Sequence, residues 1–214
     1  MRLFKVRSFV SVVFLFVAIS CNQQAPVPQK IKVTDSSVSV PQKNPYSNID
    51  QSPLDMIYFP EAYPQLKMDQ ADSTPLAARV IYSRPHKKGR LLFGEGSSLC
   101  PYGKPWRLGA NEATEIEFFT NVSIQGKNVA QGTYILYCIP YADRWTIVLN
   151  SNLHTWGLHI DEKKDVLRTD IPVMKQVPAL EDFTMIFSKA AYGADLLMAW
   201  DDVKTILPIE FASR

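Results

Sequence analysis

The sequence predicts one all-β domain over residues 51–214, either an antiparallel β-sandwich or a barrel-like fold. Three observations predict this fold. Segments such as 114–118 alternate polar and apolar residues, which is the period of a half-buried strand. Turn residues separate these segments at about 8–12-residue spacing, as in sandwiches and barrels. About 160 residues remain after the N-terminal segments, with no repeat, which is enough for one domain with a real core.

The first half of the domain is predicted to consist of short strands with turns between them. The stretch 55–66 is the longest helical alternative, but Pro60 and Pro64 interrupt it. The expected strands are 77–82, 90–93, 114–118, a hairpin of 122–124 with 128–129, and 133–139, which ends at Pro140.

The second half continues the same pattern to the end of the chain. The stretch 188–194 is long enough for one helical turn at most. Asp201 and Asp202 are predicted to form a final tight turn between two apolar runs. The expected strands are 145–149, 166–171, 183–187, 195–200 and 203–207.

Residues 1–20 have the three parts of an export signal. Arg2, Lys5 and Arg7 are followed by the apolar stretch 9–19, which is short for a membrane span, and then by small residues before Cys21. The sequence Ala-Ile-Ser-Cys at 18–21 resembles the lipobox of bacterial lipoproteins. That resemblance implies that the Cys21 sulfur takes a diacylglycerol, that Cys21 becomes the first mature residue and that its new amine is acylated, palmitate being an expected acyl group. The alternative is an ordinary signal peptide with a chance cysteine.

Residues 21–50 are predicted to form a flexible tether, because they are rich in Pro, Gln and Ser. The full chain carries 23 Lys and Arg against 21 Asp and Glu, and loss of the signal with three cations leaves a formal charge of −1. This balance argues against a nucleic-acid partner. The expected partner is a membrane, held through the N-terminal lipid. No acidic run follows Cys21, which favours an outer-membrane anchor facing the periplasm.

Residues 106–114 read Trp-Arg-Leu-Gly-Ala-Asn-Glu-Ala-Thr, and Pro-Tyr-Gly precedes them at 101–103. On this specific run, the segment 82–114 resembles the DUF2911 family, exported bacterial proteins of unknown function. Further matching segments extend the resemblance over roughly 76–209. The resemblance implies the boundaries of the domain, and its name implies no activity.

The best candidate site is the loop from Glu95 to Glu112, in which glycines permit tight turns beside aromatic, cationic, amide and acidic groups. Such groups suit a glycan or a small polar ligand, since rings stack and polar groups fix orientation. The candidate residues are Glu95, Tyr102, Trp106, Arg107, Asn111, Glu112 and, from a second segment, Trp156. The competing interpretation makes them struts of the loop. We expect Asn111 to bond the loop backbone and Arg107 to face the ligand.

Two cysteines remain after Cys21, and both stand where the resembled family usually has none. Two alternatives stay open for Cys100 and Cys138: a disulfide, which an oxidising compartment would allow, or two separate buried thiols. The three histidines lack metal-ligand spacing, so we expect no metal and no cofactor.

The sequence therefore predicts a lipid-anchored protein of the bacterial cell envelope that binds a glycan, a small polar ligand or an envelope protein, or has a structural role. We expect no catalytic residues. The alternative is an envelope hydrolase that uses carboxylates of the Glu95–Glu112 loop.

Overall fold

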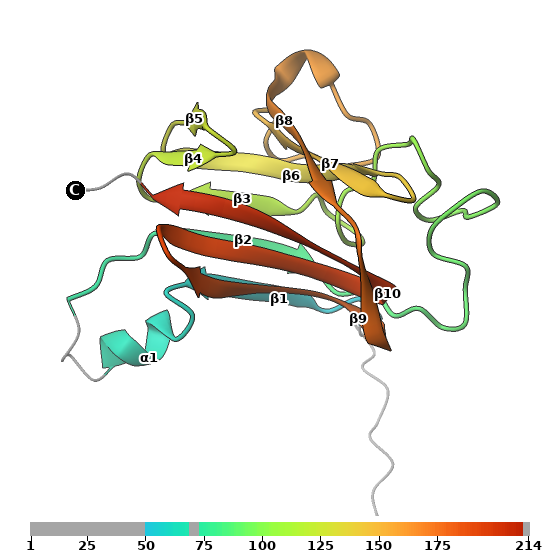
Figure 1. Cartoon of the computed structure of the whole chain (residues 1–214), viewed down its shortest axis with the longest axis horizontal. Helices are drawn as coiled ribbons and strands as arrows, with labels where there is room; N and C mark the ends of the chain where they lie inside the picture. The colour runs from blue at the N-terminus through green and yellow to red at the C-terminus, as the bar shows by residue number, and fades with distance from the viewer. Residues whose placement is uncertain (1–49, 69–72, 212–214) are drawn as a thin grey trace, which may run out of the picture. The chain divides into compact units, whose positions relative to one another are not determined.

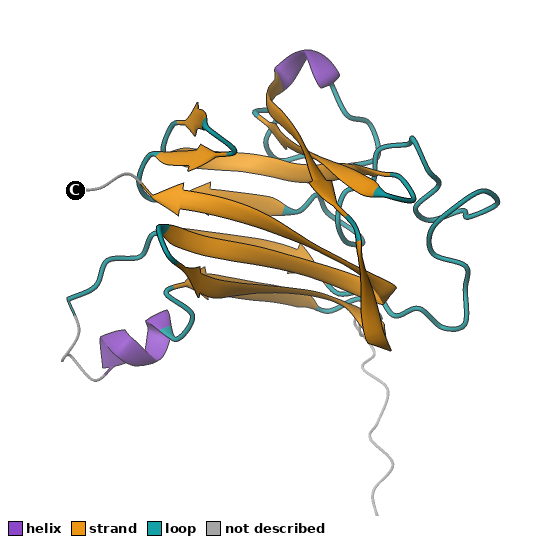
Figure 2. Cartoon of the chain, viewed as in Figure 1, coloured by secondary structure: helices purple, strands orange, loops and turns teal. Residues whose placement is uncertain are grey.

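A computed structural model of the chain describes residues 50–68 and 73–211, so the predicted export signal, Cys21 and nearly all of the tether lie outside the described residues. The elements are β1 (Leu54–Phe59), α1 (Tyr63–Met68), β2 (Ala78–Ser83), β3 (Glu115–Phe118), β4 (Val122–Ile124), β5 (Lys127–Val129), β6 (Gly132–Pro140), β7 (Arg144–Asn150), the 3-10 turn η1 (Glu162–Lys164), β8 (Asp165–Pro172), β9 (Met174–Ala190) and β10 (Gly193–Phe211). Strands dominate (Figure 2), which confirms the all-β prediction.

The strands form two stacked antiparallel sheets, a sandwich rather than a barrel (Figure 1). One sheet has six strands in the order β1-β2-β3-β6-β7-β8, and the other has four in the order β5-β4-β10-β9. The apolar residues of both inner faces form one continuous core. The loop between β2 and β3 extends at the right-hand end of the view, and α1 lies at the left-hand end.

A cluster of aromatic rings fills the core at the loop end. Trp106 stacks on Trp200 with ring centroids 5.7 Å apart. It also meets Trp145 and Phe183 edge-on, at 5.7 and 4.9 Å. Such aromatic pairs add about 0.5–1.5 kcal/mol each to the burial of their area, so this cluster strongly stabilises the joining of the two sheets.

A hydroxyl from one sheet also bonds the backbone of the other. The Tyr82 hydroxyl, on β2, accepts a hydrogen bond from Met185 N at 2.9 Å, on β9. Burial raises the pKa of Tyr82 to about 12, and the backbone hydrogen bond to Met185 offsets part of that rise.

The β4–β5 hairpin is joined to β8 through side chains. Gln125 Nε2 donates to the carbonyl of Asp170 at 2.9 Å, and Lys127 Nζ donates to the carbonyl of Arg168 at 2.7 Å. The Thr169 hydroxyl also donates to Gln125 Oε1. These bonds connect the last strand of the six-stranded sheet with the last strand of the other.

Two predicted features of the secondary structure were wrong. The stretch 90–93 is not a strand; Phe93 only makes an isolated bridge to Cys100. The predicted hairpin at Asp201 is instead a bulge in the continuous strand β10, where Asp201 adopts φ 55° and the register shifts. The last hairpin lies instead between β9 and β10, and 188–194 has no helical turn, within the limit of one turn that the sequence set.

The N-terminal part of the domain holds two elements that the sequence prediction missed. Strand β1 pairs with β2, and α1 follows it. Pro60 stands between the two elements, and Pro64 lies in the first turn of α1, where its missing N–H costs nothing.

Candidate functional site

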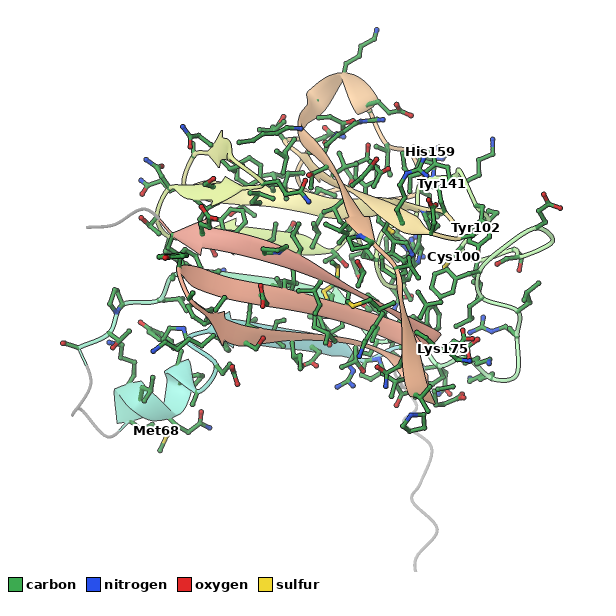
Figure 3. The ribbon with its side chains drawn as sticks, viewed as in Figure 1. Met68, Cys100, Tyr102, Tyr141, His159 and Lys175 are labelled. Carbon is green, nitrogen blue, oxygen red and sulfur yellow. The ribbon has the colours of Figure 1, made fainter. Side chains whose placement is uncertain are left out.

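In the first half of the candidate loop, a buried serine bonds the backbone and other side chains face the solvent. The buried Ser97 hydroxyl accepts hydrogen bonds from the backbone N–H groups of Leu99 and Cys100, each at 3.1 Å. Glu95 lies at an exposed turn, and Tyr102 is 39% exposed (Figure 3). These two predicted site residues therefore lie on the surface of the loop.

Trp106 is a core residue and not part of a ligand surface. Its backbone exchanges two hydrogen bonds with Cys138 on β6, at 2.7 and 2.9 Å, so the chain here runs beside β6 like a short extra strand. Its side chain is only 6% exposed, and its Nε1 donates to the carbonyl of Gly109 at 3.3 Å. The expectation that Trp106 faces a ligand is corrected, because the indole belongs to the aromatic cluster.

Arg107, the next residue, contacts Trp156. The Arg107 Nη1 donates to the carbonyl of Trp156 at 2.9 Å, and its guanidinium carbon lies 5.9 Å from the centroid of the indole. Partial burial lowers the pKa of Arg107, and the charge of Glu112 offsets part of that shift. Trp156 itself is 55% exposed. We call Arg107, Glu112 and Trp156 the Trp156 surface.

Close backbone packing holds this surface in place. Ala113 N donates to the carbonyl of Thr155 at 3.2 Å, which joins the two loops. Gly157 has φ 78°, and a Cβ on it would lie 2.9 Å from Arg107 Cβ. Only glycine fits both the angle and the space, so the position of Trp156 relative to Arg107 is set by the backbone.

Asn111 acts differently from the expectation. It adopts φ 59°, a left-handed conformation that Asn tolerates better than most residues. Its Nδ2 donates to Asp50 Oδ2 at 2.6 Å rather than to the loop backbone. Asn111 therefore allows the turn of the loop and contacts the start of the described domain.

Cys100 and Cys138 are two free, buried thiols in the core. This is the second of the two alternatives that the sequence left open. Burial raises the pKa of both thiols well above its ordinary value. Thiols that remain protonated react slowly, since the thiolate is the nucleophile.

Two of the three histidines lie beside carboxylates outside the Glu95–Glu112 loop. The ring of His86 pairs with Asp182, and His154 Nδ1 lies 3.9 Å from Glu115 Oε1. Within residues 50–68 and 73–211, no group of three or more His, Cys, Asp or Glu is placed to hold a metal ion.

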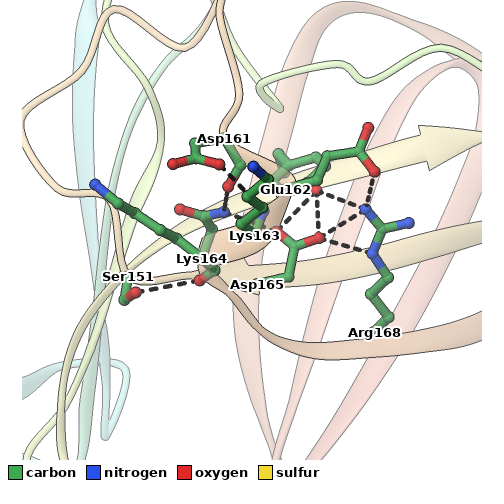
Figure 4. A network of polar contacts seen from close by, with 9 residues as sticks. Ser151, Asp161, Glu162, Lys163, Lys164, Asp165 and Arg168 are labelled. Carbon is green, nitrogen blue, oxygen red and sulfur yellow. Dashed lines mark hydrogen bonds and ion pairs between the residues drawn. The ribbon is translucent and has the colours of Figure 1, made fainter.

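The sequence interpretation missed a polar network on the outer face of the six-stranded sheet (Figure 4). Asp165 accepts hydrogen bonds from the Tyr137 hydroxyl at 3.0 Å, from Asn150 Nδ2 at 2.7 Å and from Arg168 Nε at 2.7 Å. Burial first, and then the bond to Asp165, raise the pKa of Tyr137, while the same carboxylate raises that of Arg168. Asn150 and Arg168 also bond Asp161 and Glu162, so the network holds the 151–164 loop against the sheet. The signal for it was the Asp-Val-Leu-Arg segment at 165–168, which places an acid and a base near each other.

Residues 64–209 match the family model described as "Protein of unknown function (DUF2911)". No curated protein and no solved structure matches the chain. None of the helices in the described ranges has the length and apolar character needed to cross a membrane.

Proposed function

Because the chain belongs to the DUF2911 family, whose description names no activity, we propose its function from the candidate site itself: a binding module that takes a glycan or another small polar ligand on the Trp156 surface. The observation that supports this proposal most is the exposure of Trp156. The other three tryptophans of the chain are buried, at 6% exposure or less, whereas Trp156 is 55% exposed.

The chemistry of the Trp156 surface suits a sugar. An exposed indole offers an apolar plane to the C–H face of a pyranose ring, and adjacent charged groups bond its hydroxyls. Arg107 supplies N–H donors and Glu112 a carboxylate acceptor. Gly157 and Ala113 fix the two loops, so the surface needs little ordering when it binds, which favours affinity.

We also propose that the module is anchored in the bacterial cell envelope, at the outer membrane facing the periplasm. The support is the signal-like segment 1–20 and its lipobox-like end at Cys21. Replacing Cys21 with Ala should leave the protein unprocessed or release it from the membrane fraction. Normal cleavage with continued membrane partition would contradict the anchor.

Tryptophan quenching tests the binding proposal on the mature chain. Iodide should quench chiefly Trp156, and Trp156→Phe should remove most of that quenching. A soluble oligomer of N-acetylglucosamine, as a model of envelope glycan, should protect Trp156 from iodide in the parent protein. Arg107→Ala should weaken that protection.

The matched control is Arg144→Ala, because Arg144 also lies over an aromatic ring, that of Tyr141 at 4.3 Å, but forms its ion pairs with Asp143 and Asp170 rather than with the Trp156 surface. Equal loss of protection in Arg107→Ala and Arg144→Ala would argue against a site made by Arg107. If no member of a panel of glycans and small polar solutes protects Trp156 from iodide quenching, the proposal is contradicted.

The hydrolase alternative stays a prediction. It requires carboxylates of the loop, so Glu95→Gln or Glu112→Gln should abolish turnover of a glycan that the parent protein cleaves. Binding without product release in the parent protein would instead favour the module.

A further inference from the structure

A pocket of about 480 Å³ is lined by Leu66 of α1, Lys189 near the end of β9 and Phe211 at the end of β10. These parts of the chain lie at the end of the sandwich away from the long β2–β3 loop (Figure 1). Its volume falls within the about 300–1,000 Å³ of small-molecule sites. The lining is mainly apolar, with Phe59, Leu66, Leu76 and Phe211 as its largest apolar members.

The pocket has a well-supported floor. The rings of Phe59 and Phe211 stack with centroids 5.3 Å apart, and Phe59 also meets Phe187 at 6.1 Å. Both Phe59 and Phe211 pack against the main core. Ala77 N donates to the carbonyl of Phe59 at 2.9 Å, which joins one wall to the floor.

Two charged side chains of opposite sign also line the pocket: Lys189 at the end of β9, and Glu61 just before α1. Within the described part of the chain, neither makes a hydrogen bond or an ion pair through its side chain, with each other or with a third residue. A free cation and a free anion therefore accompany an apolar space.

We propose that this pocket binds a single-chain zwitterionic amphiphile, with its acyl chain on the Phe59–Phe211 floor. The anionic group of its head meets the Lys189 ammonium, and the cationic group meets the Glu61 carboxylate. A lysophospholipid with a phosphoethanolamine head has this chemistry. A plain fatty acid matches only Lys189 and faces repulsion from Glu61, so it should bind more weakly.

The test uses the full mature chain carrying Cys21→Ser, so that no acyl chain of its own competes for the pocket. The probe is myristoyl lysophosphatidylethanolamine, titrated calorimetrically below its micelle concentration. Myristate and glycerophosphoethanolamine serve as probes that lack the cation and the chain, respectively. We expect the complete amphiphile to bind most tightly, myristate more weakly, and the isolated head group not measurably.

Variants of the protein separate the contribution of the amphiphile's acyl chain from that of its head group. Lys189→Gln and Glu61→Gln should each weaken binding of the complete amphiphile by about two- to fivefold, as for exposed charge pairs. Leu66→Asp should weaken it at least about tenfold, because a carboxylate would be desolvated beside the acyl chain. Glu61→Gln should strengthen binding of myristate, since it removes the repulsion.

The matched control is Lys175→Gln, an exposed lysine at the other end of the same strand. It should leave binding unchanged, as should Trp156→Ala, because neither residue lines the pocket.

Absence of binding, equal affinity for the head group alone, or equal weakening by Lys175→Gln and Lys189→Gln would overturn the proposal. Myristate binding as tightly as the complete amphiphile would overturn the zwitterionic assignment. The proposal is independent of the Trp156 surface, and failure of either leaves the other standing.

Discussion

Trp106 and Arg107 are neighbours in the sequence, yet they belong to two different environments. Trp106 points into the core between the sheets, where it meets Trp145, Phe183 and Trp200. Arg107 points the other way and contacts the exposed Trp156. Because side chains alternate along an extended backbone, one short segment that pairs with β6 supplies both a core anchor and a surface group. A dense set of chemical groups in sequence is therefore not one site in space.

The largest effect should come from removing the core anchor. Trp106→Ala should lower the free energy of unfolding by about 3–5 kcal/mol, since it empties the aromatic cluster. Trp156→Ala should change it by about ±0.5 kcal/mol. Urea unfolding of both variants measures the contrast. Similar losses in the two would mean that Trp156 also supports the fold.

A smaller difference is expected between two buried tyrosine hydroxyls. Tyr82→Phe should cost about 1–3 kcal/mol, because it leaves the buried N–H of Met185 without its acceptor. Tyr137→Phe should cost less, since Asp165 keeps its bonds from Asn150 and Arg168. Urea midpoints at neutral pH should rank the two variants, and the reverse order would contradict the assigned roles.

Tyr82 also predicts that the stability of the fold depends on pH. The pKa of Tyr82 is raised to about 12 in the folded protein, against about 10 in the unfolded chain. The neutral phenol is favoured by folding, so its contribution is complete below pH 10 and is lost as the pH rises toward 12. The stability difference between the parent protein and Tyr82→Phe should therefore shrink above pH 10. A constant difference up to pH 12 would mean that Tyr82 ionises normally.

Replacing Asn111 should lower the free energy of unfolding by an amount that depends on whether the new residue tolerates a left-handed backbone. Asn111→Ala should cost about 1 kcal/mol, because alanine is disfavoured at φ 59°. Asn111→Gly should cost only a few tenths, since glycine accepts this angle even though the bond to Asp50 is lost. Equal losses would show that the bond, not the angle, gives Asn111 its role.

The smallest effect is expected for the two cysteines, whose thiols should not react with a thiol reagent in the folded protein. Cys100 and Cys138 are fully buried, so a thiol reagent should react with neither at neutral pH, and with both after unfolding without a reductant. Absence of free thiols in the unfolded, unreduced protein would establish a disulfide instead.

The strands of the sheets were predictable where one face is buried and the other is not. Strand β8 alternates buried and exposed side chains along most of its length, and the predicted 166–171 falls within it. Prediction failed at Asp201, because two acidic residues give the same local signal for a hairpin turn and for a bulge. Only the pairing of β10 with β9 across that point distinguishes them.

The candidate site was predictable only in part. Glycines and polar residues correctly indicated an irregular loop, and the adjacent surface does contain Arg107, Glu112 and Trp156. The burial of Trp106 could not be predicted from the sequence, since it depends on rings from β7, β9 and β10 that are distant in sequence. The pocket beside α1 was missed for the same reason, because its lining comes from residues 59–66, 74–77, 120, 189 and 211, which are distant in sequence.

The side chains of Gln125 and Lys127 have a consequence for self-association. Strand β8 ends the six-stranded sheet, and a terminal strand with free carbonyls is a template onto which another copy can add a strand. Here the carbonyls of Asp170 and Arg168 already accept hydrogen bonds from the hairpin. These two polar side chains thus hinder aggregation through the β8 edge, and shortening them should promote oligomers formed by strand addition before it measurably weakens the fold.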